Sequence, residues 1–197
     1  NATVRCWGSN ASGQFGSGNT DSSTFPVDIG ISYVTAVAAG TNSTCFIVSG
    51  AVQCAGANTN GQLGDGTLDP NPSPIDTGLT SAISVSVGDE FACAVISGGA
   101  KCWGRNNRRQ LGTNASLNPT KTPTNVSGLT SDVSKVVSGL QHACALLSTE
   151  EMKCWGFNSN GQLGDESVTQ RVTAVAVSTL SSGVTAISAR ENSTCAV

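Results

Sequence analysis

The chain is poor in charge, in aromatic side chains and in long apolar runs. Charged residues make up 12% of its 197 residues, aromatic residues make up 5%, and the formal net charge is −3. A weakly acidic chain lacks the basic surface that nucleic-acid binding requires. No apolar run approaches the roughly 20 residues of a membrane-spanning helix, and neither a signal peptide nor an initiating Met is present. We expect no nucleic acid and no membrane as partners, and a processed product or a piece of a longer chain.

Histidine is almost absent, which narrows the possible chemistry. His142 is the single histidine, so neither a histidine metal pair nor a Ser-His-acid triad can be assigned. It stands two residues before a cysteine, where the chain elsewhere has Ser43, Phe91 and Ser193. That alternation favours a structural role over a catalytic or metal-binding one.

The carboxylates give no acid–base pair either. Asp65 and Asp165 follow glycine-rich turns and fit turn formation through their own backbone, whereas the adjacent Asp89 and Glu90 fit a solvated loop. The glycine-rich turns also lack the lysine of a phosphate-binding loop. We expect no enzymatic activity, no catalytic residues and no cofactor.

Cysteine, by contrast, is abundant, with eight residues. The close pairs Cys45/Cys54, Cys93/Cys102 and Cys144/Cys154 are too widely spaced for the Cys-x₂₋₄-Cys knuckles of zinc sites. Disulfides are therefore favoured over metal binding, and no metal site is expected. Because disulfides persist in oxidising compartments, the sequence predicts a secreted, extracellular protein.

The cysteines belong to a repeat. A Cys-Trp-Gly-x-Asn segment or a close variant starts at Cys6, Cys54, Cys102 and Cys154, at spacings of 48, 48 and 52 residues. Each leads into a tetrad similar to Gly-Gln-Leu-Gly, at residues 13–16, 61–64, 109–112 and 161–164. A second recurring cysteine precedes each segment, at Cys45, Cys93, Cys144 and Cys195. Alternating apolar stretches such as residues 82–87 precede these second cysteines and predict half-buried strands.

Hairpin geometry explains the cysteine spacing. A two-residue turn at Ser97-Gly98 places Cys93 opposite Cys102, on a non-hydrogen-bonded pair whose Cα atoms lie roughly 4.5 Å apart, within disulfide range. The same count about Ser49-Gly50 pairs the cysteines of the preceding unit. In the Cys144/Cys154 unit, one extra residue lengthens the turn around Thr149 and keeps the two cysteines opposed.

These features predict an all-β fold. Four tandem repeats of about 50 residues, made of strands and glycine-rich turns, fit β-propeller blades. We expect residues 1–197 to form a single propeller-type domain, either as a closed four-bladed ring or as an arc of a larger assembly.

The motif Gly-x₄-Cys-Ala-Val/Leu, followed by Lys-Cys-Trp-Gly-x-Asn-x-x-Gly-Gln-Leu-Gly-Asp, resembles the regulator of chromosome condensation repeat family over essentially the whole chain. The resemblance implies seven-bladed propellers with four strands per blade, so four repeats cannot build such a ring alone. Of the family's varied roles, a secreted, disulfide-bonded, partner-binding branch is the one that suits this composition. Fold analogy does not choose the partner. Four positions depart from the motif: Ala55 for Trp, Phe15 for Leu, and Arg109 and Arg190 for Gly.

Six Asn-x-Ser/Thr sequons suggest N-linked glycans. They lie at Asn1, Asn10, Asn42, Asn114, Asn125 and Asn192. Asn42 and Asn192 hold the same position in two repeats, and a secreted chain passes through a glycosylating compartment if its source is eukaryotic.

Arg105, Arg108 and Arg109 form the one concentrated basic spot. A solvated loop is the simpler interpretation. Contact with a protein or glycan partner is the alternative, because Arg is enriched at binding surfaces.

The two ends look like the halves of one hairpin. Cys195-Ala196-Val197 would pair with residues 3–6, with Cys195 opposite Cys6. The hairpin can be completed within a closed ring, by the next subunit, or by a longer chain. We favour completion between subunits, because four blades are few for this family and a low-charge, glycosylated surface suits a filament. A single chain should then be an open arc, with Cys6 and Cys195 too far apart to bond within it.

We therefore expect an extracellular structural protein that assembles with copies of itself. The alternative is a secreted binding module, such as a protein inhibitor or a glycan-binding propeller, which would instead be a soluble monomer with aromatic and Arg anchors on one face.

Overall fold

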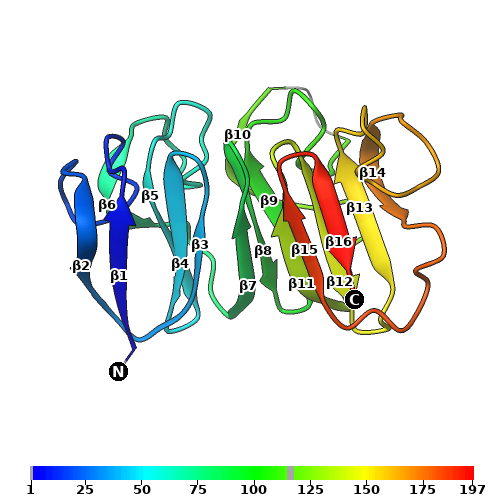
Figure 1. The fold of residues 1–197 in the computed structure, drawn as a ribbon, viewed down its shortest axis with the longest axis horizontal. Coiled ribbons are helices and arrows are strands. Elements are labelled where there is room, and N and C mark those ends of the chain that lie inside the picture. The colour runs from blue at the N-terminus through cyan, green and yellow to red at the C-terminus, as the bar shows by residue number, and fades with distance from the viewer. Residues whose placement is uncertain (1, 115–117) are drawn as a thin grey trace.

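The computed structural model describes residues 2–114 and 118–197 and consists of β-strands joined by turns. Within these residues, the strands form three four-stranded antiparallel sheets and two two-stranded sheets (Figure 1). The described part of the chain contains no helix long and apolar enough to cross a membrane. The expected all-β architecture of about 50-residue blades is confirmed.

Three blades are complete four-stranded meanders. The first comprises β3 (Val34–Ala39), β4 (Ser43–Val48), β5 (Ala51–Gly56) and β6 (Asn71–Asp76). The second comprises β7 (Ala82–Val87), β8 (Phe91–Ile96), β9 (Gly99–Gly104) and β10 (Thr120–Asn125). The third comprises β11 (Val133–Ser138), β12 (His142–Leu147), β13 (Met152–Gly156) and β14 (Arg171–Ala176).

Two half-blades flank them. One pairs β1 (Thr3–Gly8) with β2 (Ser23–Ser32), and the other pairs β15 (Ile187–Arg190) with β16 (Ser193–Ala196). The described chain thus contains the last two strands of one blade at its beginning and the first two strands of another at its end.

The hairpin register expected from the cysteine spacing is confirmed. Cys93 lies opposite Cys102, with their Cα atoms 4.1 Å apart and their sulfurs bonded. Ser97 and Gly98 both have positive φ, at 49° and 80°. Positive φ at both central residues defines the type I′ turn, whose twist matches that of the paired strands.

The other two hairpins have the same pairing. The first blade contains the disulfide Cys45–Cys54, and the third contains Cys144–Cys154. Each bridge closes a loop of about ten residues, which corresponds to a stabilisation of roughly 2–3 kcal/mol in the chain-entropy view. Such a contribution matters in blades that have few aromatic side chains.

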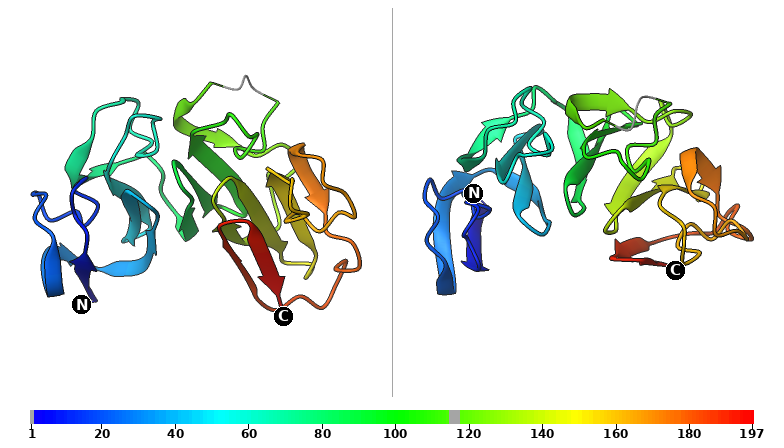
Figure 2. Two further views of the ribbon diagram at one scale, coloured as in Figure 1. Left: turned by 45° about the horizontal axis from the view of Figure 1, so that its top comes forward. Right: turned by 90° about the horizontal axis from the view of Figure 1, so that it is seen from above.

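The blades are arranged as an open arc and not as a closed ring. The first strands of successive blades, β3, β7, β11 and β15, contact one another in order. Figure 2 shows the half-blades at the two ends of the arc, with the N-terminus on one and the C-terminus on the other. Cys6 lies in β1 and Cys195 lies in β16, and the two form no disulfide.

Candidate functional site

The two half-blades are the most distinctive feature of the molecule, because their registers make them complementary. In β15–β16, Ser188 lies opposite Cys195, as Ser86 lies opposite Cys93 in the second blade. In β1–β2, Cys6 lies opposite Val27, as Cys154 lies opposite Val175 in the third blade. The half-blade β15–β16 therefore corresponds to the first two strands of a blade, and the half-blade β1–β2 corresponds to the last two.

The complete blades show how the second strand of a blade pairs with the third. In the second blade, Cys93 pairs with Cys102 and Ala92 pairs with Trp103. Applied to the half-blades, this ladder would place Cys195 opposite Cys6 and Thr194 opposite Trp7.

The motif tryptophan also joins each blade to the blade before it. The indole N–H of Trp103 donates to the carbonyl oxygen of Gln62 at 2.9 Å, and that of Trp155 donates to the carbonyl of Gln110 at the same distance. Both side chains are fully buried. Each indole is therefore buried against the Gly-Gln-Leu-Gly-like tetrad of the preceding blade and hydrogen-bonded to its backbone.

The glycine that closes each tetrad makes this contact possible. A Cβ added to Gly64 would lie 2.7 Å from the Nε1 of Trp103, and one added to Gly112 would lie 2.8 Å from the Nε1 of Trp155. Since real Cβ atoms do not approach ring atoms so closely, the indole packs directly on the glycine backbone.

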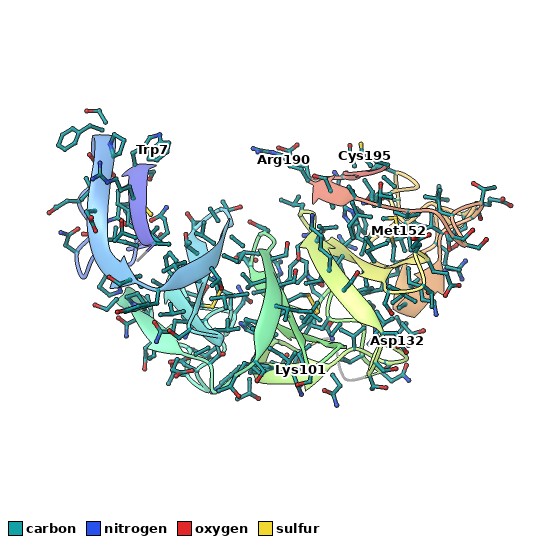
Figure 3. All side chains as sticks on the ribbon, turned by 90° about the horizontal axis from the view of Figure 1, so that it is seen from below. Trp7, Lys101, Asp132, Met152, Arg190 and Cys195 are labelled. Atoms are coloured by element: carbon teal, nitrogen blue, oxygen red, sulfur yellow. A yellow bond between two sulfur atoms is a disulfide. The ribbon has the colours of Figure 1, made fainter. Side chains whose placement is uncertain are left out.

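Trp7 and the tetrad at residues 161–164 are the unmatched members of this series. Trp7 is 62% exposed at one end of the arc (Figure 3). At the other end, a hollow of about 320 Å³ is lined by Gln162, Leu163, Gly164, Thr194 and Cys195, among others. This hollow, here called the tryptophan socket, lies where a following blade would insert its indole.

The sequence did not reveal Trp7 as a site residue. The motif indicates a structural tryptophan in each blade, and by itself it does not show that each indole packs on the tetrad of the preceding blade. The order of tetrad and tryptophan along the chain is the signal from which the socket can be found.

A second set of residues that sequence reasoning missed organises the loops. The motif asparagines Asn10, Asn58, Asn106 and Asn158 are fully buried. The Oδ1 of each accepts a hydrogen bond from the backbone N–H five residues later, at 2.9–3.2 Å. Their recurrence at one motif position in all four repeats is the signal that was available.

The two tetrad-following aspartates belong to the same loops, as the turn interpretation expects. Asp65 accepts hydrogen bonds from the Thr67 backbone N–H at 3.1 Å and from the amide of Asn58 at 3.1 Å. Although burial alone would raise the pKa of Asp65, its hydrogen bonds outweigh that effect and the pKa lies below its usual value. The carboxylate is thus held ionised as a structural acceptor.

Asp165 repeats this arrangement and adds an ion pair with Arg171 at 2.6 Å. Its pKa is also lowered, because the hydrogen bonds of Ser167, Arg171 and Asn158 and the guanidinium charge outweigh the opposing effect of burial. Among residues 2–114 and 118–197, no three His, Cys, Asp or Glu side chains are placed to hold a metal ion.

The sequons differ sharply in accessibility. Asn42, Asn114, Asn125 and Asn192 are exposed. Asn1 lies outside the described residues, as do two residues of the Asn114 sequon. Asn10, by contrast, is fully buried, and its Nδ2 donates to the carbonyls of Asn19 and Asp21 at 3.1 Å. The folded chain therefore gives this sequon no room for a glycan.

The arginine cluster is engaged within the chain. Arg105 forms an ion pair with Glu90, and the guanidinium of Arg108 lies 5.0 Å from the ring centroid of Phe157 in the next blade. Arg109 has φ of 62° at the position where three repeats have glycine. Contact between this cluster and a partner stays a prediction.

The chain matches family models of known repeats. The model described as "Regulator of chromosome condensation (RCC1) repeat" matches residues 3–47, 49–95 and 98–146, and a second model of that repeat matches residues 133–162. A sequence search of the curated proteins finds no match.

Solved structures agree with this match in fold. Human WBSCR16 has a TM-score of 0.85 at 22% identity over 96% of this chain and 51% of its own. Prp20p from Saccharomyces cerevisiae has a TM-score of 0.85 at 16% identity over 96% and 50%. Yeast RCC1 (Prp20), solved with Kap60, has a TM-score of 0.83 at 16% identity over 98% and 48%. The chain thus spans about half the length of these propellers.

Proposed function

Because the chain belongs to the regulator of chromosome condensation (RCC1) repeat family, whose blades pack side by side, we propose that its half-blades are assembly surfaces. In this proposal, β15–β16 of one copy and β1–β2 of the next form one four-stranded blade. The protein is then a non-enzymatic, extracellular structural subunit that joins to copies of itself head to tail. The geometry of Trp7 and the tryptophan socket carries the proposal.

Three properties of the ends support a second copy as the occupant. The exposed indole of Trp7 has its internal counterparts seated on tetrads identical or similar to residues 161–164. The open strand edges have matching registers. Cys6 and Cys195 are free and stand at the two positions that are bonded in each complete blade.

The hairpin disulfides support the location. Three bonded pairs in the described chain indicate an oxidising environment. Secretion is the ordinary route to such an environment, and an oxidising medium would also bond Cys6 of one copy to Cys195 of the next. An interface of this kind is heterologous, and therefore forms rings or open filaments and not two-fold dimers.

The half-blades have one other natural occupant, which is further blades of the same polypeptide. The matched propellers are about twice as long as this chain. The mass of the natural polypeptide separates the two cases, since assembly between copies requires the half-blades to be the ends of the mature protein.

Replacing Trp7 by alanine is expected to abolish the assembly. Native protein should run on non-reducing electrophoresis as a ladder of multiples of 19.8 kDa, apart from attached sugar, and collapse to one band with reductant. The Trp7→Ala protein should run as a single band and scatter light as a monomer, because the socket of the neighbouring copy is left unfilled.

Ile83→Ala is the matched control. Ile83 is 63% exposed but lies on β7, away from both half-blades, so the ladder should persist. Folding of the Trp7 variant is expected to be normal, because the Trp7 side chain is 62% exposed in the single chain. A monomeric native protein, or an undiminished ladder in the Trp7 variant, would contradict the proposal.

Glycosylation is part of the same proposal, and the fold makes it selective. Glycopeptide mass spectrometry of native protein should show sugar on Asn42 and Asn192, which are exposed at equivalent loop positions. Asn10 should be bare, because its Nδ2 is buried and hydrogen-bonded. Sugar on Asn10, or an intact mass equal to that of the bare polypeptide, would be the opposite result.

A further inference from the structure

One glycine in each complete blade marks where neighbouring blades come closest. Gly40, Gly88 and Gly139 stand between the first and second strands, each five residues before a cysteine. None has φ in the left-handed region, so backbone strain does not require glycine at these positions.

The close approach of other atoms requires it instead, and at all three positions a backbone carbonyl of the next blade is among them. A Cβ added to Gly40 would lie 2.5 Å from the carbonyl oxygen of Gly88, and one added to Gly88 would lie 2.7 Å from that of Gly139. A Cβ added to Gly139 would lie 2.7 Å from the carbonyl oxygen of Glu191. In the described residues, the three contacts between the first strands of successive blades thus each place a glycine against the backbone of the next blade, and the rings of Phe91 and His142 in the same blade crowd Gly88 and Gly139 as well.

The backbones also bond to one another at these loops. The N–H of Asp89 donates to the carbonyl of Leu140 at 3.3 Å, and the N–H of Leu140 donates to the carbonyl of Glu191 at 2.8 Å. The loops line a common hollow of about 720 Å³ on the concave side of the arc.

Arg190 occupies the equivalent position in the terminal half-blade, five residues before Cys195. It is exposed, and Figure 3 shows its side chain at the end of the arc, projecting toward the open side. Gly40 is its best template, because Ser43 and Ser193 follow the two positions alike. At Gly40, the contacts under 3 Å come from the next blade alone.

We infer that Arg190 sets the angle of the joint between successive copies. This inference rests on the proposed head-to-tail assembly. The blade that follows the shared blade is β3–β6 of the neighbouring copy, whose Gly40 carbonyl would arrive at the position of the Arg190 Cβ. That blade cannot dock with the geometry of the three internal contacts. The two blades are therefore held further apart on the concave side of the arc, and successive copies are inclined to one another.

The guanidinium suits this opened joint. The β3–β4 loop of the incoming blade, which contains Gly40, presents backbone carbonyls. Arg offers five N–H donors and no acceptor. No ion pair in the described residues engages Arg190. The Arg190 side chain can therefore donate hydrogen bonds to backbone carbonyls of the incoming blade. With glycine at this position, those carbonyls would instead pack directly on the backbone.

The shape of the assembly follows from this joint. If every blade contact were alike, the rotation from blade to blade would be uniform and the arc would continue along one ring. A different rotation at one contact per copy turns a heterologous assembly away from that path, toward an open helical one.

Electron microscopy of three proteins tests the inference. Native assemblies should show arcs inclined at each joint. Arg190→Gly should shift this inclination toward the blade-to-blade rotation within an arc, with closed or more strongly curved particles. Arg190→Ala keeps the Cβ and should retain the native inclination, although its joint dissociates more readily.

The outcomes separate the two proposals. An unchanged joint in Arg190→Gly overturns the inference while leaving the proposed function intact. An inclination that changes equally in the alanine and glycine variants also overturns it, because the Arg190 Cβ would then not be what keeps the neighbouring blade from packing closely. Absence of any assembly by the native protein removes the proposed function, and this inference with it.

Discussion

Replacing Trp103 by alanine is expected to lower the free energy of unfolding by about 3–5 kcal/mol. The side chain is fully buried between two blades, and its truncation leaves a cavity and strips the Gln62 carbonyl of the indole N–H at 2.9 Å. Because the indole packs on Gly64 and bonds to Gln62 in the tetrad of the preceding blade, this one change weakens the junction between the two blades. Urea denaturation of the wild-type and variant proteins measures the loss.

Trp7→Ala is the matched control for stability, since it makes the same substitution at the same motif position. Its exposed side chain contacts no preceding blade in a single chain, so the monomer should change by no more than about 0.5 kcal/mol. Equal losses in both variants would show that the indole stabilises its own hairpin and not the junction between blades.

The first complete blade shows how the fold tolerates alanine at this position. Ala55 replaces the tryptophan, and it packs in one cluster with Phe46 and Phe15. The corresponding residues in the next repeat are Ala94 and Leu63. Two phenylalanines thus supply the bulk that the missing indole would have supplied.

The sequence predicted the repeat, the strands and the hairpin register, because these depend on local spacing. Residues 82–87 form β7 as the alternating pattern indicates, and the cysteine pairs lie opposite one another. The pairing follows from a two-residue turn and strand alternation, and neither requires knowledge of distant contacts.

The contacts between blades could not be predicted in this way. Ala55 and Phe15 look like unrelated departures from the motif until the structure places them in one cluster. Gly88 looks like a turn residue, although it is needed for the approach of the next blade. Asn10 matches a sequon, but its burial depends on a loop closed by residues 19–21. Each depends on partners that lie close only after folding.

The stability of the chain is expected to fall as the pH is lowered from about 6.5 to 4, because of His142. Burial lowers the pKa of His142 from 6.5 to about 4. Its Nε2 lies 2.8 Å from the Thr194 hydroxyl, which itself donates to the Gln162 carbonyl. The hydroxyl must therefore accept from an Nε2–H, and Nδ1 is left as a buried nitrogen without a hydrogen-bond partner.

The sign follows from the order of the two pKa values. Above about pH 7 the imidazole is neutral in both states, and its contribution is fully present. Below 6.5 the unfolded chain takes up a proton that the folded chain refuses, so unfolding is favoured until the pH reaches about 4. A difference of this size corresponds to roughly 3 kcal/mol. Below that range, the lowered pKa values of Asp65 and Asp165 cause a further loss as their carboxylates are protonated.

His142→Phe isolates this effect, because Phe91 fills the same position in the second blade and is fully buried there. Urea denaturation of wild-type protein at pH 7 and pH 4.5 should show the loss, whereas the phenylalanine variant should be nearly flat over that interval. A wild-type protein without the loss would mean that His142 is protonated in the folded state. An equal loss in the variant would place the titration on the carboxylates. Thr194 belongs to the terminal half-blade β15–β16. The hydrogen bond between His142 and Thr194 therefore ties the protonation of His142 to the strand pair that would join the next copy.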